Sequence, residues 1–92
     1  MVIKIRLNKS QRVERCDTEK AFAIQYSRHG DSMLFLSKKY TKIKEEIIEK
    51  DGVYWSIEYH VEFPQWMFEY MDDNQKGTIK LIQEQWKQEH NS

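Results

Sequence analysis

Apolar and polar residues alternate along two stretches of this chain. Residues 2–7 alternate aliphatic and cationic side chains, with the period of a half-buried β-strand. Residues 53–63 alternate apolar or aromatic side chains with polar ones, which predicts a long antiparallel strand with one solvated face. We expect the apolar face of this long strand to form much of the core.

Two shorter strands are predicted between these stretches. Apolar residues in 21–27 and 32–36 flank a turn at Arg28-His29-Gly30-Asp31. The second of these strands is apolar on both faces, so we expect it to lie centrally in its sheet. Residues 8–17 are polar and charged, and predict a loop or an irregular strand.

Residues 37–50 fit two structures. Their apolar positions suit a helix that ends before Gly52. They also suit a hairpin around a three-residue loop, Lys50-Asp51-Gly52, with Gly52 in the left-handed region. We favour the hairpin, and the register that it predicts pairs Ile47 with Trp55, Ile43 with Tyr59, and Lys44 with Glu58.

Two helices are predicted after the long strand. Pro64 suits the first helical position, where its missing N–H is not needed, and apolar residues recur at helical spacing up to Met71. Polar residues 72–77 predict a break. Thr78 is then expected to cap a last helix whose apolar face consists of Ile79, Ile82 and Trp86.

These elements predict an α+β fold in a single small domain that spans residues 1–92. Its architecture is an antiparallel curved sheet or a small open barrel of four or five strands, covered by two C-terminal helices. Twelve aromatic residues supply large side chains for a core that needs no disulfide or metal. Most of the late aromatic residues are expected to be buried in that core: Trp55, Tyr59, Phe63, Trp66, Phe68 and Tyr70.

The sequence predicts a cytoplasmic protein in a bacterial host cell. Cys16 is the only cysteine, so no intramolecular disulfide can form, as suits a reducing compartment. No segment approaches the roughly 20 apolar residues that span a bilayer, and the N-terminus has no signal-peptide pattern.

Charge is distributed unevenly along a chain that is neutral overall. Residues 1–50 contain 12 Lys or Arg and 7 Asp or Glu, whereas residues 51–92 contain 3 and 8. Four lysines lie beside a tyrosine, an arrangement typical of surfaces that bind phosphates with cations and stack bases on rings. The predicted nucleic-acid-binding residues are Lys38, Lys39, Tyr40, Lys42 and Lys44.

Other features of the charge pattern keep this prediction open. Cations of the N-terminal half are candidates to extend the same surface: Lys4, Arg6, Arg12 and Arg15. A solvated charged segment is the alternative interpretation, because Glu45 and Glu46 follow the lysines directly. The opposite charges of the two halves also allow a homodimer.

Protein binding is the second predicted activity. Tyr54 lies on the wet face of the long strand, and Phe68 lies in the first predicted helix. An aromatic side chain left exposed at either position is a candidate anchor for a partner protein.

No pattern of catalytic or metal-binding residues is recognisable. Residues 72–79 resemble the start of an EF-hand loop, but Lys76 and Gln83 occupy positions that need oxygen ligands and a bidentate carboxylate. No histidine or cysteine pair has metal-ligand spacing, and three glycines cannot build a phosphate loop. We therefore expect a non-enzymatic protein with no catalytic residue, metal or cofactor.

Three short sequence patches resemble a family of small domains found in phage-type proteins and appended to phage-like DNA helicases. The patches are Lys20–Ile24, Phe35–Lys39 and Val61–Met67. In the second patch, Ser37 replaces the proline of the family pattern and Lys39 replaces its serine. The resemblance implies a phage genome and a link to DNA metabolism, and it implies no catalytic residue.

The expected function is therefore that of a phage-type accessory module. It would bind nucleic acid or a DNA-processing protein through the basic N-terminal half. The alternative is a phage-encoded inhibitor or adaptor that binds a host enzyme through the acidic C-terminal half.

Overall fold

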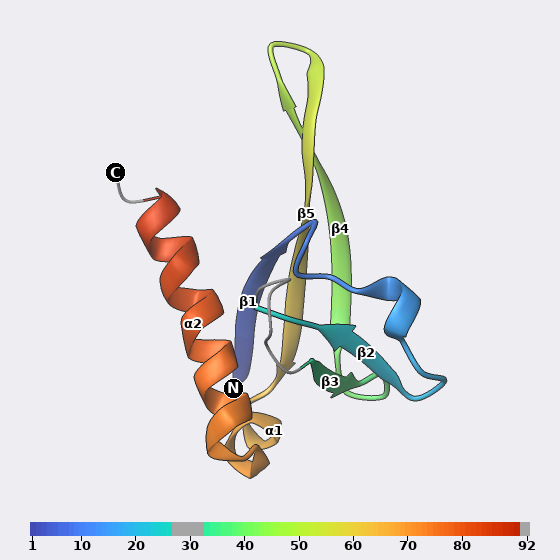
Figure 1. Cartoon of the computed structure of the whole chain (residues 1–92), viewed down its shortest axis with the longest axis vertical. Coiled ribbons are helices and arrows are strands. Elements are labelled where there is room, and N and C mark those ends of the chain that lie inside the picture. The colour runs from blue at the N-terminus through green and yellow to red at the C-terminus, as the bar shows by residue number, and fades with distance from the viewer. Residues whose placement is uncertain (27–32, 91–92) are drawn as a thin grey trace.

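The computed structural model describes residues 1–26 and 33–90, and it contains two antiparallel sheets and two C-terminal helices (Figure 1). The elements in chain order are β1 (Val2–Asn8), the 3-10 helix η1 (Glu14–Cys16), β2 (Ala21–Ile24), β3 (Leu34–Ser37), β4 (Lys42–Lys50), β5 (Val53–Pro64), α1 (Gln65–Tyr70) and α2 (Asp73–His90). One sheet has the order β1-β5-β4, and the other pairs β2 with β3. The predicted α+β class is confirmed, with the strands in two open sheets.

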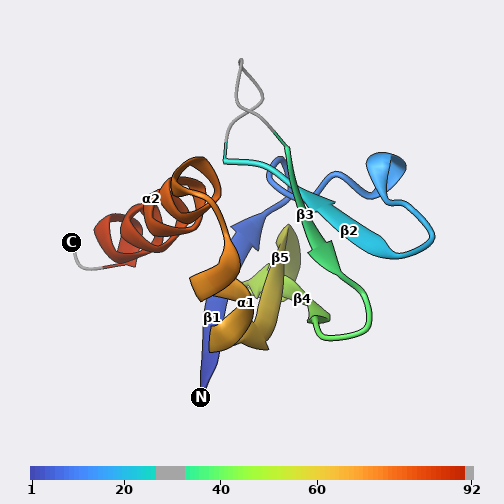
Figure 2. The ribbon, with the colours of Figure 1, turned by 90° about the horizontal axis from the view of Figure 1, so that it is seen from below.

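The core lies between the apolar face of the three-stranded sheet and the β2–β3 pair, and α2 packs beside β1 (Figure 2). Each fully buried aliphatic side chain stabilises the fold by about 1.5–3 kcal/mol. The buried aliphatic residues of the main cluster are Ile5, Leu7, Ile24, Leu34, Leu36, Val61, Ile79 and Ile82. Tyr59 and Phe63 are buried with them, as predicted.

The prediction of a mainly aromatic core is wrong for three rings. Trp55 is 66% exposed, Trp66 45% and Tyr70 86%. Trp55 lies in the part of β5 that extends beyond its pairing with β1, which ends at Glu58. Trp66 and Tyr70 lie in α1, whose apolar residues Met67 and Phe68 pack against the core instead.

Strand β3 is not central, contrary to the sequence prediction. Within the described residues it pairs with β2 alone, in a register that sets Leu34 opposite Ile24. Leu34 and Leu36 are buried, but Phe35 faces away from the core and is 46% exposed. The sequence inference assumed that a strand with apolar side chains on both faces is covered on both faces. In this strand one face is buried and the other carries an exposed phenylalanine. The predicted turn at residues 28–31 lies outside the described residues.

The hairpin predicted around residue 51 is confirmed, but its predicted register is wrong. Its turn has two residues, Asp51 and Gly52, with φ of 55° and 78°, as a type I′ turn requires. A bulge between Ile48 and Glu49 shifts the register once more. The observed pairs are Ile47 with Ile57, Ile43 with Val61, and Lys44 with His60.

The outer part of this hairpin projects from the body of the molecule as an arm, which we define as residues 47–57 (Figure 1). Strand β1 pairs with β5 only as far as Glu58, so no third strand among the described residues pairs with the arm. Four of its six large apolar side chains are exposed, namely Ile47, Val53, Tyr54 and Trp55, whereas Ile48 and Ile57 are half-buried. Helix α1 lies at the opposite end of the long axis (Figure 1).

The helix boundaries differ from those predicted. Pro64 is the last residue of β5, and α1 begins one residue later. Helix α2 begins at Asp73, so Thr78 lies inside it and donates its hydroxyl to the Asn74 carbonyl oxygen at 3.1 Å. A break between the two helices is present, but it spans residues 71–72 and does not extend to residue 77 as predicted.

The start of α2 is capped by the residues that resemble an EF-hand opening. Asp72 Oδ1 accepts the Gln75 N–H at 2.8 Å, and Gln75 Oε1 accepts the Asp72 N–H at 3.1 Å. This reciprocal pair is a capping box, and it satisfies two N–H groups that the helix itself cannot. No helix in the described parts of the chain is both long and apolar enough to cross a bilayer.

Candidate nucleic-acid interface

The polar face of the three-stranded sheet carries three rows of side chains that run across its strands. Alternate residues of a strand share a face, and paired residues of neighbouring strands lie opposite each other. With β5 in the middle, the rows are Lys4–Glu62–Lys42, Arg6–His60–Lys44 and Asn8–Glu58–Glu46. The face therefore changes from cationic in the first two rows to anionic in the third, at the base of the arm.

This face and the C-terminal part of α2 line a groove of about 1030 Å³. Helix α2 contributes Gln83, Trp86 and Lys87. Trp86 positions Arg6, whose guanidinium carbon lies 4.4 Å from the ring centroid, as a cation–π contact requires. The charged residues that line the groove are five cations and three carboxylates: Lys4, Arg6, Lys42, Lys44, Lys87, Glu45, Glu46 and Glu62.

The lysines of the groove are not neutralised by direct ion pairs within the described part of the chain. The ion pairs shorter than 4 Å there join Arg12 to Asp17 and His60 to Glu46. Glu62 lies between Lys4 and Lys42 in the register but forms no such pair with either. These lysines therefore remain able to bind an external anion.

The structure divides the lysine cluster predicted from the sequence. Lys42 and Lys44 lie on β4 and line the groove. Lys38 and Lys39 precede β4, in the turn after β3, and neither lines the groove.

The two lysines of this turn lie close to aromatic rings. Lys38 Nζ lies 5.4 Å from the Phe22 ring centroid, and Lys39 Nζ lies 5.3 Å from that of Tyr40. Tyr40 packs edge-on against Trp66 at 4.9 Å between centroids, although it is still 43% exposed. Tyr40 thus belongs to an aromatic cluster with α1 and not to the groove.

Arg12 does not extend the groove. Its guanidinium forms a bidentate pair with Asp17, with both N–O distances at 2.7 Å. The Arg12 side chain is 6% exposed, and its hydrogen bonds lower the pKa of Asp17 below its ordinary value. Arg15 lies in η1, beside β2, and is not part of the groove lining either.

The two candidate protein-binding residues have different surroundings. Tyr54 lies on the arm and is 53% exposed. Phe68 is partly buried against the core, and Lys76 Nζ lies 5.9 Å from its ring centroid. The exposed rings of α1 are Trp66 and Tyr70.

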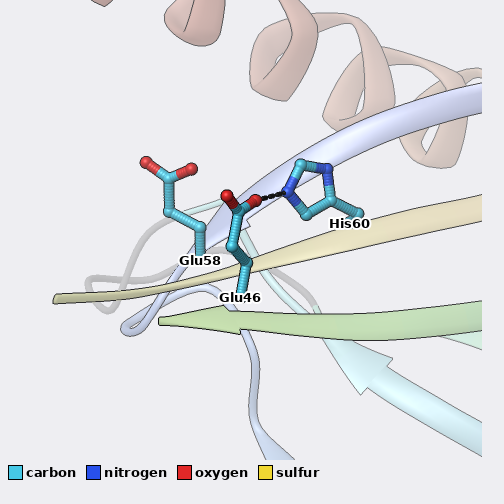
Figure 3. Close-up of side chains that lie close together, drawn as sticks. All are labelled: Glu46, Glu58 and His60. Carbon is cyan, nitrogen blue, oxygen red and sulfur yellow. Dashed lines mark hydrogen bonds and ion pairs between the residues drawn. The ribbon is translucent and has the colours of Figure 1, made fainter. Parts of the chain in front are cut away.

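The structure also brings together three side chains that the sequence did not connect. Glu46, Glu58 and His60 project from the same face of β4 and β5, with Glu46 between the other two (Figure 3). His60 Nε2 contacts Glu46 Oε2, and the potential ligand atoms of all three residues lie within 4.8 Å of one another. The predicted register hid this cluster, because it placed Lys44 opposite Glu58.

Comparison of the chain with protein-family models, curated proteins and solved structures found no match.

Proposed function

We propose that this protein is a non-enzymatic accessory module of phage type that binds nucleic acid in the cytoplasm of a bacterial host cell. The observation that carries the proposal is the set of four cations on one face of the sheet, two on each side of β5: Lys4, Arg6, Lys42 and Lys44. Cations that neutralise phosphates release condensed counterions, which drives binding to any nucleic acid. The resemblance of the three patches supports the phage-type context.

The spacing of these cations suits an extended polyanion. Same-face residues of one strand lie about 7 Å apart, and β1 and β4 lie about 10 Å apart across β5. A nucleic-acid backbone offers phosphates that reach several of these cations, whereas a single small anion contacts one pair. The guanidinium plane of Arg6 on Trp86 also belongs to the class of surfaces on which unpaired bases stack.

Binding of labelled oligonucleotides tests the proposal. We expect single-stranded DNA or RNA to bind at low salt, with an affinity that falls as salt rises. Lys42→Ala/Lys44→Ala removes two phosphate contacts. The plot of log K against log salt, which falls with salt, should therefore become less steep by about 1.4 for a single strand. Fluorescence anisotropy between about 50 and 200 mM salt covers the range in which such slopes are steep.

The matched control is Lys38→Ala/Lys39→Ala. It removes the same two charges from a segment outside the groove, so we expect a smaller change in affinity and slope. An equal change in both variants would show that only net charge matters. Undetectable binding of every oligonucleotide at low salt would contradict the proposal.

Protein binding through the arm is a second candidate function, in which the module inhibits or links a host enzyme. It is favoured by the exposure of Val53, Tyr54 and Trp55, which are 66%, 53% and 66% accessible. Large rings on a projecting element are typical anchors of protein interfaces. The acid excess of residues 51–92 matches a partner with an apolar pocket and a basic rim.

A further inference from the structure

The base of the arm holds an arrangement that is unfavourable without a bound cation. Glu46 and Glu58 are directly opposite each other in the β4–β5 register. Like charges in a cross-strand pair destabilise a sheet, because the two carboxylates lie close together. His60 contacts Glu46, but Glu58 has no such partner among the described residues.

The three side chains have the geometry of an incomplete metal-coordination shell. One imidazole nitrogen and two carboxylate oxygens lie within 4.8 Å of one another (Figure 3). Ligand atoms about 2.1 Å from a single zinc ion lie roughly 3–4 Å apart. Side-chain rotations that move the ligand atoms by about 1 Å would therefore bring all three within bonding distance of one ion. Glu46 is 50% exposed and His60 32%, which leaves room both for such rotation and for water ligands.

We infer that Glu46, Glu58 and His60 bind a divalent transition-metal ion of the zinc class. The imidazole nitrogen favours Zn²⁺ and its neighbours over Mg²⁺ and Ca²⁺, which prefer oxygen ligands throughout. Three protein ligands and water complete a four-coordinate shell. The ion neutralises the Glu46–Glu58 repulsion and joins β4 to β5 where the third strand of the sheet ends.

Two cations next to the site oppose binding, but weakly. Arg6 and Lys44 both lie opposite His60 in the register. The Arg6 guanidinium is held on the Trp86 ring, and Lys44 is exposed, so solvent and salt screen its charge.

Calorimetric titration of the tag-free chain of residues 1–92 with ZnCl₂ tests the inference directly. We expect one equivalent to bind, and MgCl₂ or CaCl₂ at the same concentration to give no comparable signal. Each of Glu46→Gln, Glu58→Gln and His60→Asn removes one ligand and should weaken zinc binding about 10-fold or more. Glu49→Gln is the matched control, since it removes one exposed carboxylate from the same strand without touching the cluster.

Thermal unfolding provides a second measurement that does not depend on titration. Zinc should raise the melting temperature of the wild-type chain and of Glu49→Gln by more than that of Glu58→Gln, which binds zinc more weakly. Without metal, Glu58→Gln should melt higher than wild type, because it removes the like-charge pair. Zinc binding that is undetectable at millimolar concentration, or unchanged in all three ligand variants, would overturn the inference.

Discussion

Arg12 and Asp17 attach the loop after β1 to strand β2. Asp17 Oδ1 accepts both an Arg12 N–H at 2.7 Å and the Ala23 N–H at 2.8 Å. Arg12 Nη1 also donates to the Ala23 carbonyl oxygen at 3.1 Å. The pair thus satisfies both backbone groups of a residue that is completely buried. Such charge-assisted hydrogen bonds are shorter and stronger than neutral ones.

Replacement of this carboxylate should lower stability in a pH-dependent way. Asp17→Asn keeps the shape but removes the charge, and we expect it to cost about 1–3 kcal/mol at neutral pH. The hydrogen bonds from Arg12 lower the pKa of Asp17 from its ordinary value of 3.8. The contribution of Asp17 is therefore complete above pH 3.8 and is lost as the pH falls through the folded-state pKa.

Urea unfolding from pH 7 to pH 2.5 would measure this effect. The difference in unfolding free energy between wild type and Asp17→Asn should shrink toward the acid end. Glu19→Gln serves as the control, because this exposed acid has no ion pair in the described structure, and its effect should stay within about 0.5 kcal/mol. A wild-type advantage that stays constant down to pH 2.5 would exclude Asp17 as its source.

At the scale of elements, the β4–β5 hairpin and helix α2 each contain a glycine, and the two glycines have different backbone conformations. Gly52 has φ of 78° in the turn, whereas Gly77 lies inside α2 with helical backbone. A Cβ added at either position meets no atom within 4 Å. The effect of an added methyl group therefore depends only on backbone conformation.

We expect the same substitution to change stability in opposite directions at these two sites. Gly52→Ala forces a side chain into the left-handed region and should cost about 1 kcal/mol. Gly77→Ala removes the entropy cost of glycine in a helix and should gain about 0.5–1 kcal/mol. Urea unfolding of both variants would check the signs. Gly52→Asn should cost less than Gly52→Ala, because asparagine tolerates positive φ, and an equal cost would contradict this explanation.

The hairpin also shows how far the sequence determines the elements. Alternation in residues 53–63 predicted one strand of the hairpin, whereas residues 37–50 fitted a helix as well as the second strand. The hairpin was favoured with a three-residue loop at Lys50-Asp51-Gly52, and the observed turn has only Asp51 and Gly52. A two-residue turn alone would place apolar Ile47 opposite polar Ser56. A one-residue bulge places Ile47 opposite Ile57, so that apolar side chains again share one face. The mismatch of Ile47 with Ser56 could therefore have predicted the bulge and, with it, the Glu46–Glu58 pair. Thr78 misled the prediction because Asp72 and Gln75, six and three residues earlier, form a better cap.

At the scale of the whole molecule, the groove and the arm are separate surfaces with different chemistry. The groove combines cations of β1 and β4, which are distant in sequence, and no local pattern showed that they meet across β5. Of the lysines that the sequence singled out, Lys42 and Lys44 line the groove. Lys38 and Lys39 lie outside it, because strand β4 begins only after them.

Substitutions on the arm should separate the two candidate functions. Tyr54→Ser/Trp55→Ser removes two exposed rings and the contact of Lys50 Nζ with Trp55, which lies 5.0 Å from the ring centroid. We expect stability to change by no more than about 0.5 kcal/mol and oligonucleotide affinity to stay unchanged. Capture of a host protein by the immobilised chain should be lost, whereas Trp66→Ser, at the far end of the molecule, should retain it. Retained capture in the arm variant would rule out the arm as the interface.

Strand β4 forms one border of the three-stranded sheet, and no other strand in the described parts of the chain pairs with that border. A free border of this kind offers unpaired N–H and C=O groups to another molecule, which is how sheets grow into fibrils. Six of the nine residues of β4 are charged: Lys42, Lys44, Glu45, Glu46, Glu49 and Lys50. Adding a strand of another molecule there would bring these charges out of water and against a neighbour. The same lysines that line the groove thus protect concentrated solutions of the protein from edge-to-edge aggregation.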